Sequence, residues 1–204
     1  MMEDRHPAHV SDPVRVAGDA DRARIAAMLA RAFVDDPSMS FIFPDSTERA
    51  KRMPLLFGLL FDADALSGMR LMSEGGEAAT LWRGPGHGET GLFVLLRQAW
   101  PLWRALGGAI GRALAVSQAI EAHMPTSPHW YLHIAGCDPA AQGKGHGGAA
   151  IRSGLARVAG SGLPTYLETA TERNLGLYRA LGFEVIDTWD VPRGGPRFWS
   201  MLRT

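Results

Sequence analysis

Hydrophobic residues recur at helical spacing in the first part of the chain and at strand spacing in much of the rest. The apolar positions of the first expected helix are Ile25, Met28, Leu29, Ala32 and Phe33. Asp19 can cap this helix, which should end near Asp36-Pro37 because proline disfavours helical geometry in the residue before it. A second helix is expected over about 47–66, bent or started by Pro54.

Several short apolar segments bounded by turn residues are expected to form strands. They cover residues 14–17, 69–73, 78–83, 129–137, 165–169, 183–191 and 197–202. Further helices are expected over about Thr90–His123, interrupted near Pro101 or Gly107-Gly108, and over 145–159 and 174–181. This order combines a strand–turn–helix–strand unit with antiparallel pieces. It predicts an α/β (α+β mixed) fold, with a mixed sheet and helices on both faces.

Composition narrows the expected partners. The 204 residues suffice for one sizeable domain, and no repeat or low-complexity linker divides them, so a single domain over 1–204 is expected. The 21 basic and 21 acidic side chains give a formal net charge of zero, whereas a protein that follows a phosphate backbone usually has a basic excess. Nucleic acid is therefore not an expected partner.

The same kind of reasoning sets expectations for location and metal content. The segment Met1–Val10 is polar and lacks the apolar core of a signal peptide, and arginines and a proline interrupt the most apolar region, 92–116. We expect a cytoplasmic protein without a membrane partner. Cys137 is the only cysteine, which excludes an internal disulfide or thiolate zinc site, and the seven histidines are too scattered to predict a metal site.

The segment 142–148, which reads Gln-Gly-Lys-Gly-His-Gly-Gly, carries the clearest chemistry. Its glycines allow a tight turn between a strand and a helix and a close approach of the backbone to a ligand. The N–H groups at the start of the following helix would suit a phosphate or pyrophosphate. The spacing does not match a P-loop, in which Ser or Thr would stand at the position of Gly145, and a plain glycine-rich turn is the alternative.

A wider pattern around this turn resembles a known family signature. Residues 137–147 read Cys-Asp-Pro-Ala-Ala-Gln-Gly-Lys-Gly-His-Gly, and they are followed by Leu167-Glu168-Thr169, Asn174 and Leu177-Tyr178-x-x-Leu181-Gly182-Phe183. Together these segments resemble the GNAT superfamily of N-acetyltransferases, and most of all its puromycin N-acetyltransferase branch. The resemblance implies a mostly antiparallel sheet of six to seven strands. It also implies a substrate-pocket half over 1–128 and an acetyl-CoA-binding half over 129–204.

The resemblance further implies a site for acetyl-CoA, as acyl-donor substrate, and no metal. The backbone of three strand residues would pair with the pantetheine arm: Ala135, Gly136 and Cys137. The turn would hold the pyrophosphate, through Gln142, Gly143, Lys144, Gly145, His146, Gly147 and Gly148. Asn174 resembles the residue that bonds the pantetheine, although an asparagine at a helix start is also a common cap.

Acetyl transfer to an amine requires that one proton leave nitrogen and that one reach sulfur. Tyr178 resembles the family's general acid, because a phenol held close to a departing thiolate can protonate it. Its alternative role is that of a buried aromatic ring packed beside Leu175 and Leu181. Cys137, at the end of a core strand, is expected to be a small packing residue and not a nucleophile.

Two residues are candidates for the base that accepts the nitrogen proton. Glu168 lies in the strand before the helix of Tyr178, and His133 lies in the strand 129–137. Simple alternation would place His133 on one face with Tyr131 and Cys137, and Leu132 and Ile134 on the other. A structural hydrogen bond is the alternative role for each candidate. A water chain, or no dedicated base, also remains open.

The acceptor side of the site is less specified. By the resemblance, residues 33–44 would shape the pocket, including Asp35, Asp36, Phe41 and Phe43. The two aspartates would attract a cationic amine or simply be solvated. Trp82 and the insertion 84–128 are expected to wall the pocket. Three arginines of the insertion are expected to form an exposed helix face: Arg97, Arg104 and Arg112.

The function favoured by these patterns is acetyl transfer from acetyl-CoA, by direct attack, to an amine of a small molecule such as an antibiotic or metabolite. A protein or peptide acetyltransferase is one alternative. A module of this fold that binds acyl-CoA without turnover, as a sensor, is another, and Asn174 and Tyr178 argue against it. The sequence specifies neither the amine nor the oligomeric state, for which a homodimer is one option.

Overall fold

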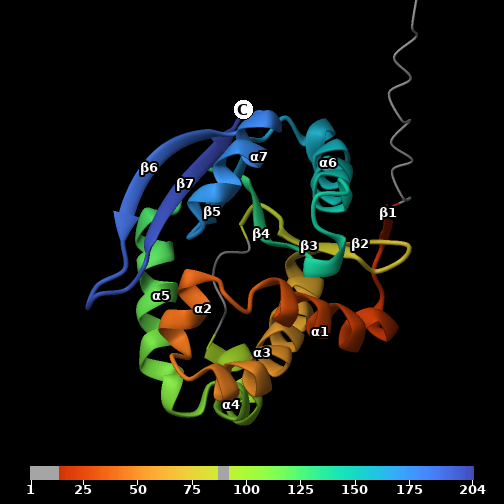
Figure 1. Ribbon diagram of the computed structural model, residues 1–204. Coiled ribbons are helices and arrows are strands. Elements are labelled where there is room, and N and C mark those ends of the chain that lie inside the picture. Colours follow the sequence, from red (N-terminus) through yellow and green to blue (C-terminus); the bar gives the residue numbers. More distant parts are fainter. Residues whose placement is uncertain (1–13, 87–91) are drawn as a thin grey trace, which may run out of the picture.

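A computed structural model of the chain describes residues 14–86 and 92–204, with residues 92–98 described by their backbone alone. One seven-stranded sheet runs through it in the order β1-β2-β3-β4-β5-β7-β6 (Figure 1). The strands are β1 (Val14–Val16), β2 (Gly68–Ser73), β3 (Ala78–Arg83), β4 (Trp130–Cys137), β5 (Thr165–Thr169), β6 (Glu184–Asp190) and β7 (Arg197–Arg203). Only β4 and β5 pair in parallel. The expected mixed, mostly antiparallel sheet is confirmed.

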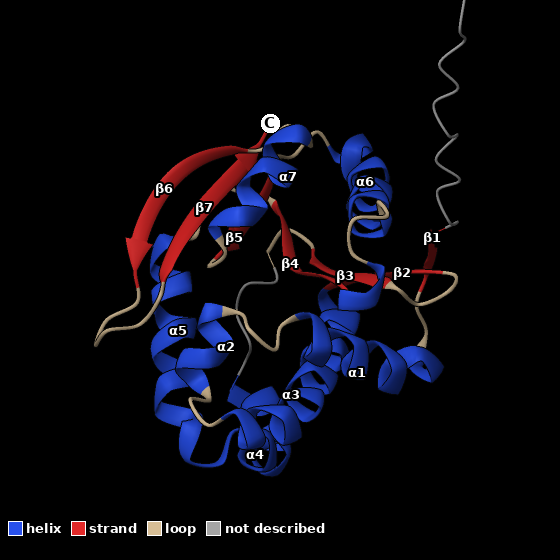
Figure 2. Cartoon of the chain, viewed as in Figure 1, coloured by secondary structure: helices blue, strands red, loops and turns tan. Residues whose placement is uncertain are grey.

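Helices lie on both faces of this sheet (Figure 2). They are α1 (Arg22–Ala32), α2 (Pro37–Ile42), α3 (Ser46–Ser67), α4 (Leu92–Leu106), α5 (Ile110–His123), α6 (His146–Val158) and α7 (Leu175–Ala180). Two hydrophobic clusters follow this division. Leu81 and Ile134 pack with residues of α1 and α3, whereas Trp82 and Leu132 pack with residues of α6 and α7. We call these the α3 face and the α6 face.

The short helix α2 is a difference from the sequence expectation, which ended a helix at Asp36-Pro37. Asp36 begins a new helix instead, because its side chain accepts hydrogen bonds from the backbone N–H groups of Ser38 and Met39. Proline at the first helical position is compatible with this role, since its missing N–H would have had no helical partner there. The break at Gly107–Ala109 is confirmed. The expected helix start at Thr90 lies outside the described residues.

A second difference concerns the faces of β4. Its pairing with β3 shifts between Leu81↔Ile134 and Trp82↔Leu132, which leaves His133 as the extra residue of a bulge. His133 and Ile134 therefore both project to the α3 face. Cys137 projects to the other face, where a Cβ on Gly147 of α6 would lie 3.6 Å from the Cys137 Cβ. The expectation that His133 and Cys137 share a face was wrong.

Within the described ranges, no helix combines the length and the apolar character of a membrane span.

Candidate active site

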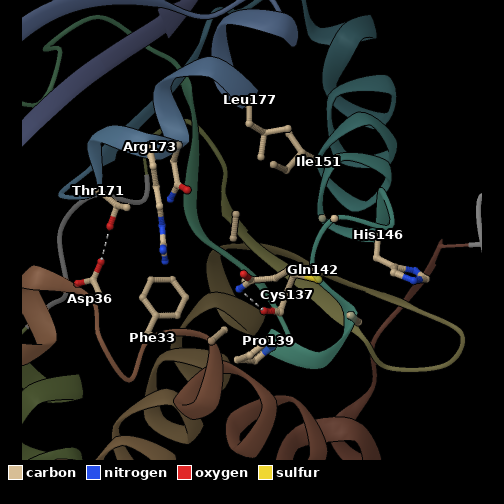
Figure 3. A pocket seen from close by; sticks show the side chains of 18 of the residues that line it. Phe33, Asp36, Cys137, Pro139, Gln142, His146, Ile151, Thr171, Arg173 and Leu177 are labelled. Atoms are coloured by element: carbon tan, nitrogen blue, oxygen red, sulfur yellow. Dashed lines mark hydrogen bonds between the residues drawn. The ribbon is translucent and has the colours of Figure 1, made fainter.

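A pocket of about 540 Å³ opens beside the carboxyl end of β4, among α1, α6 and α7 (Figure 3). Its walls come from both parts of the chain. Residues 31–36 and Thr80 contribute from the first part. The second part contributes β4, the glycine turn, the start of α6, and α7.

The strands β4 and β5 separate at this pocket. They pair only at Trp130↔Thr165 and Tyr131↔Tyr166, whereas the other edge of β4 stays paired with β3 as far as Ala78↔Cys137. The end of β4 therefore has an edge that β5 does not cover, and Ala135, Gly136 and Cys137 of this segment line the pocket. Backbone groups at such an edge can bind an extended ligand in the manner of an added strand.

The glycine turn joins β4 to α6 through two left-handed residues. Gly143 has φ 77° and Gly145 has φ 88°, a region that residues with a Cβ rarely adopt. Gly145 is the N-cap of α6, and no side chain caps this helix. The start of the helix, at residues 145–148, therefore lines the pocket without a capping side chain at its N-cap. This arrangement fits a phosphate or pyrophosphate, which also gains from the positive end of the helix dipole.

Most of the expected donor-binding residues are brought together here. Those that line the pocket are Ala135, Gly136, Cys137, Gln142, Gly143, Gly145, His146, Gly147, Gly148 and Asn174. Lys144 is not among the lining residues: its Nζ donates to the carbonyl of Ala140 from an exposed position. The Gln142 side chain donates to the carbonyl of Cys137, which ties the turn to the end of β4.

Tyr178 and Asn174 reach the same pocket from α7 and the turn before it. Tyr178 is buried, and its ring meets that of Phe183 edge-on at 6.1 Å. Burial raises the pKa of Tyr178 well above its ordinary value, with a smaller contribution from the charge of Glu168, so the phenol keeps its proton at neutral pH. Asn174 holds the N-cap position of α7 but makes no capping hydrogen bond with its side chain. Its side chain is thereby left for the pocket.

Cys137 lines the pocket with a partly buried side chain. Burial raises the pKa of its thiol, and the nearby N–H of Gly147 opposes this shift only in part. A thiol with a raised pKa is a weak nucleophile at neutral pH. These surroundings favour a packing role.

Sequence reasoning did not identify Arg173 and Thr171, which also line the pocket. Figure 3 shows the Arg173 side chain extending into the pocket toward Phe33. Thr171 donates to Asp36 at 3.2 Å, so this contact joins the start of α2 to the loop after β5. Their position just before Asn174 was the only signal in the sequence that could have pointed to them.

The two candidate bases lie outside this pocket's lining, on the α3 face of the separated strands. Glu168 accepts a hydrogen bond from the hydroxyl of Tyr131. The Nδ1 atom of His133 lies 2.6 Å from Oδ2 of Asp64, a fully buried residue of α3. Arg83 of β3 donates to the other oxygen of Asp64, also at 2.6 Å. We call these five residues the polar cluster. Sequence reasoning missed Asp64 and Arg83.

Burial dominates the electrostatics of the polar cluster. It raises the pKa of Glu168 to about 7, although the hydrogen bond from Tyr131 and the charge of Arg83 oppose the shift. Burial would raise the pKa of Asp64 too, but His133 and Arg83 together outweigh it and hold that pKa below its ordinary value. Asp64 is therefore ionised near neutral pH, while Glu168 changes its charge there.

Several expectations for the acceptor side need correction. Trp82 does not wall the pocket: it is fully buried under α6, with its indole N–H donating to Thr80. Phe43 belongs to the core on the α3 face. Asp35 and Asp36 do line the pocket, but the carboxylate of Asp36 caps α2 and accepts a hydrogen bond from Thr171. None of the described residues of the insertion 84–128 lines the pocket.

The insertion arginines differ from one another. Arg104 is exposed, as expected. Arg112 is also exposed in part, but its Nε donates to the carbonyl of Ile42 at 2.9 Å and so fastens α5 to α2. The side chain of Arg97 lies outside the described residues.

Known proteins share both the sequence pattern and the fold. The model of the acetyltransferase (GNAT) family matches residues 86–183. An uncharacterized N-acetyltransferase of Schizosaccharomyces pombe is 28% identical over 175 residues, which cover 80% of this chain and 70% of that protein.

Two solved structures show the similarity of fold over nearly the whole chain. One is described as histone acetyltransferase HPA2 and related acetyltransferase from Corynebacterium glutamicum, with a TM-score of 0.69, 24% identity, and coverage of 95% of this chain and 96% of that one. The other is arylalkylamine N-acetyltransferase 2 from Aedes aegypti, with a TM-score of 0.64, 13% identity, and coverage of 94% and 98%. This chain is thus similar in sequence to the acetyltransferase (GNAT) family over residues 86–183, and it shares the fold of these solved acetyltransferase structures.

Proposed function

We propose that this protein is an N-acetyltransferase that moves an acetyl group from acetyl-CoA to an amine of a small molecule. The observation that carries the proposal is the convergence, in one pocket, of a strand edge, a glycine turn and a protonated phenol. The edge is that of Ala135–Cys137, the turn lies at the start of α6, and the phenol is Tyr178. Each of these features suits a different part of the acyl donor.

The residues divide the work of binding along the pocket. The N-terminal amides of α6 and the left-handed turn would hold the pyrophosphate. The uncovered edge of β4 would hydrogen-bond the pantetheine, with Asn174 beside it, and would direct the thioester toward the point where β4 and β5 separate. An amide of this edge can also donate to the thioester oxygen as it gains charge.

Tyr178 would supply the proton that sulfur needs when the C–S bond breaks. The phenol is protonated at neutral pH and lines the donor pocket, so it can donate to a thiolate that is held close to it. The nitrogen must lose a proton in exchange. The polar cluster, on the other face of the separated strands, contains the groups that can receive it.

Two other functions remain distinguishable alternatives. A protein or peptide acetyltransferase would use the same donor site with a larger acceptor. A sensor would bind acyl-CoA without turnover, and the orientation of Asn174 and Tyr178 into the pocket argues against it. Within the small-molecule class, the puromycin N-acetyltransferase branch is part of the proposal because of Leu167-Glu168-Thr169 and the closing Phe198-Trp199-Ser200-Met201.

A panel of acceptors tests the proposal. Release of free CoA is followed with putrescine, phenethylamine, puromycin and a lysine-containing peptide, each with acetyl-CoA. Acetyl-CoA itself should raise the melting temperature, by an amount that follows RT ln(1 + [L]/Kd). Turnover of a small amine is the expected result. Turnover of the peptide alone would select the first alternative. Binding without any turnover would select the sensor, and a folded protein that acetyl-CoA does not stabilise would refute the donor site.

Three expectations about partners complete the proposal. We propose that the protein acts in the cytoplasm, that it binds neither nucleic acid nor membrane, and that a homodimer is its assembled form if it self-associates. The balanced charge supports the absence of a nucleic-acid partner. Sedimentation with and without DNA, RNA and vesicles of anionic lipid tests the expected partners and the assembly. A shift with any of these ligands would contradict the proposal.

A further inference from the structure

We propose that Asp64, anchored by Arg83, is a positioning residue that holds His133 as the proton acceptor for the amine. The idea rests on the proposed function and deepens it, because it selects one of the two candidate bases. Asp64 lies in α3, 69 positions before His133 in the chain. It is a residue of the polar cluster and not of the donor pocket.

Both oxygens of Asp64 are in use. Oδ1 accepts from Nε of Arg83 and Oδ2 lies against Nδ1 of His133, each at 2.6 Å. The Asp64 side chain is 0% exposed, and the Arg83 side chain is 24% exposed. A buried carboxylate is expensive unless it is paired and hydrogen-bonded, and this one is both. The Asp64 carboxylate is therefore held in one position and in its ionised form.

The charge on Asp64 determines which nitrogen of His133 carries the proton. An ionised carboxylate can only accept a hydrogen bond, so Nδ1 of His133 must be the donor. In the neutral ring, Nε2 then holds the lone pair and is the atom that can take up a proton. The His133 side chain is 14% exposed, whereas that of Asp64 is 0% exposed.

The position of His133 fits this role. The last paired residues of the separating strands are Tyr131 and Tyr166. Two residues beyond this last pair, the same register would place His133 opposite Glu168. Four residues beyond Tyr131 lies Ala135, the first residue of the edge that would hold the thioester. His133 shares the α3 face with Tyr131, and the bulge lets Ile134, the next residue, pack on that face as well.

The neighbours of His133 explain why Glu168 is the weaker candidate. The titratable and charged groups that face His133 are Asp64, Arg83, Tyr131 and Glu168. Oε1 of Glu168 already accepts from Tyr131, and its Oε2 is enclosed with no hydrogen-bond partner. Oε1 of Glu168 is therefore engaged and its Oε2 is enclosed, whereas 14% of the His133 side chain is exposed.

The proton balance of the step is complete. His133 takes one proton from the ammonium form of the acceptor, which frees the nitrogen lone pair. The C–N bond forms and the C–S bond breaks with its electron pair on sulfur, which Tyr178 protonates. The nitrogen loses its second proton, which restores the Tyr178 phenol, and His133 releases the first one to solvent. The products are the amide, CoA and one proton.

A measurement without substrate tests the positioning directly. Long-range ¹H–¹⁵N spectra of the histidine rings, with His133 assigned from a His133→Gln variant, report which ring nitrogen carries the proton. We expect Nδ1–H in the wild type. In Asp64→Asn, the amide can turn its NH₂ group toward Nδ1, and the proton should move to Nε2. A wild-type His133 that is protonated on Nε2 alone would overturn the proposal, even if the variant did not fold.

Kinetics test the consequence, with phenethylamine or putrescine, whichever the wild type acetylates faster. Asp64→Asn should lower kcat by roughly a hundredfold, the lower end of what a positioned base contributes. The acidic limb of the pH–rate profile should be lost, as in His133→Ala. Adding Asp64→Asn to His133→Ala should cost nothing more, because Asp64 acts through His133.

A matched control separates this effect from general damage to α3. Asp62→Asn removes a carboxylate two residues away that pairs with Arg22 on the surface, and it should leave kcat unchanged. The proposal is overturned if Asp64→Asn keeps full activity, if its cost is the same in the His133→Ala background, or if Glu168→Gln alone removes the acidic limb. A wild type without turnover or acetyl-CoA binding would refute the proposed function instead, and the ring spectra would still decide the tautomer.

Discussion

The two sides of the separated strands β4 and β5 are built in different ways. The donor pocket, among α1, α6 and α7, offers backbone groups to the donor: a strand edge, a turn with two left-handed glycines, and the start of a helix. On the α3 face, the polar cluster is made of side chains from α3, β3, β4 and β5. A backbone site depends on a contiguous segment, whereas a side-chain site depends on how distant elements pack.

The largest expected effect comes from disrupting the glycine turn of the donor pocket. Gly145→Val should abolish acetyl-CoA binding, because Gly145 has φ 88° and a branched side chain would both strain the turn and screen the amides of α6. Calorimetric titration measures the affinity, and circular dichroism confirms the fold. Gly160→Val is the control, since this glycine has open space around it and no left-handed φ. Unchanged affinity in Gly145→Val would refute the placement of the pyrophosphate.

The next effect concerns the one side chain on the donor side to which we assign chemistry. Tyr178→Phe should lower turnover roughly ten- to thousandfold, at and below the usual contribution of a positioned proton donor. Acetyl-CoA affinity should stay within a few-fold, because the ring still packs against Phe183. Full activity would make Tyr178 a packing residue. A parallel loss of binding would make its hydroxyl a structural group.

A smaller effect tests the burial of the polar cluster through stability. The folded protein raises the pKa of Glu168 from 4.5 to about 7. The folded state therefore binds this proton more tightly than the unfolded chain, and the stability gained is complete below about pH 4.5 and lost as the pH rises through 7.

Glu168→Gln should remove this dependence. Relative to the variant, the wild-type melting temperature should fall by a few degrees between pH 5 and pH 8, as followed by calorimetry. Glu172→Gln, at an exposed glutamate, should behave like the wild type. Parallel curves for wild type and Glu168→Gln would mean that the carboxyl is not desolvated as the structure indicates.

The smallest effect sharpens the claim that the donor pocket offers backbone groups to the donor. Lys144→Ala should change acetyl-CoA affinity by no more than about fivefold, the equivalent of ~1 kcal/mol for an exposed charge. Its Nζ is occupied by the carbonyl of Ala140, and Lys144 is not a lining residue. Titration at low and moderate salt measures the change. A loss of tenfold or more would show that this lysine contacts the phosphates.

The elements with strong local signals were predictable. The apolar spacing of α1, the β2–β3 hairpin and the glycine turn all lie where their residues indicated. The helix α2 was missed because six residues give too short a periodicity. Asp36 and Pro37 are also residues that can either stop one helix or start another. Reading aspartate and proline as N-cap and first helical position would have found it.

The bulge in β4 shows where local patterns fail. Alternation treats each strand as isolated, but the face of each residue also depends on its partner strand. Trp82 and Leu132 are buried under α6, and Leu81 and Ile134 under α1 and α3. When β3 and β4 pair so that both of these pairs are buried on their own faces, His133 has no partner residue on β3. No feature of the segment 130–137 by itself records that constraint.

What the sequence determined by itself is the glycine turn between β4 and α6, because its geometry follows from a contiguous run of residues. The conformational preferences of the left-handed glycines and of the helix that follows them act over a few residues. The spacing of Asn174 and Tyr178 on one short helix is likewise local. What only the tertiary structure decided is the pairing of Asp64 and Arg83 with His133, and the enclosure of Glu168. Those relationships come from the packing of α3 against the sheet, which removes water from charged groups far apart in the chain and so fixes their partners and their charge.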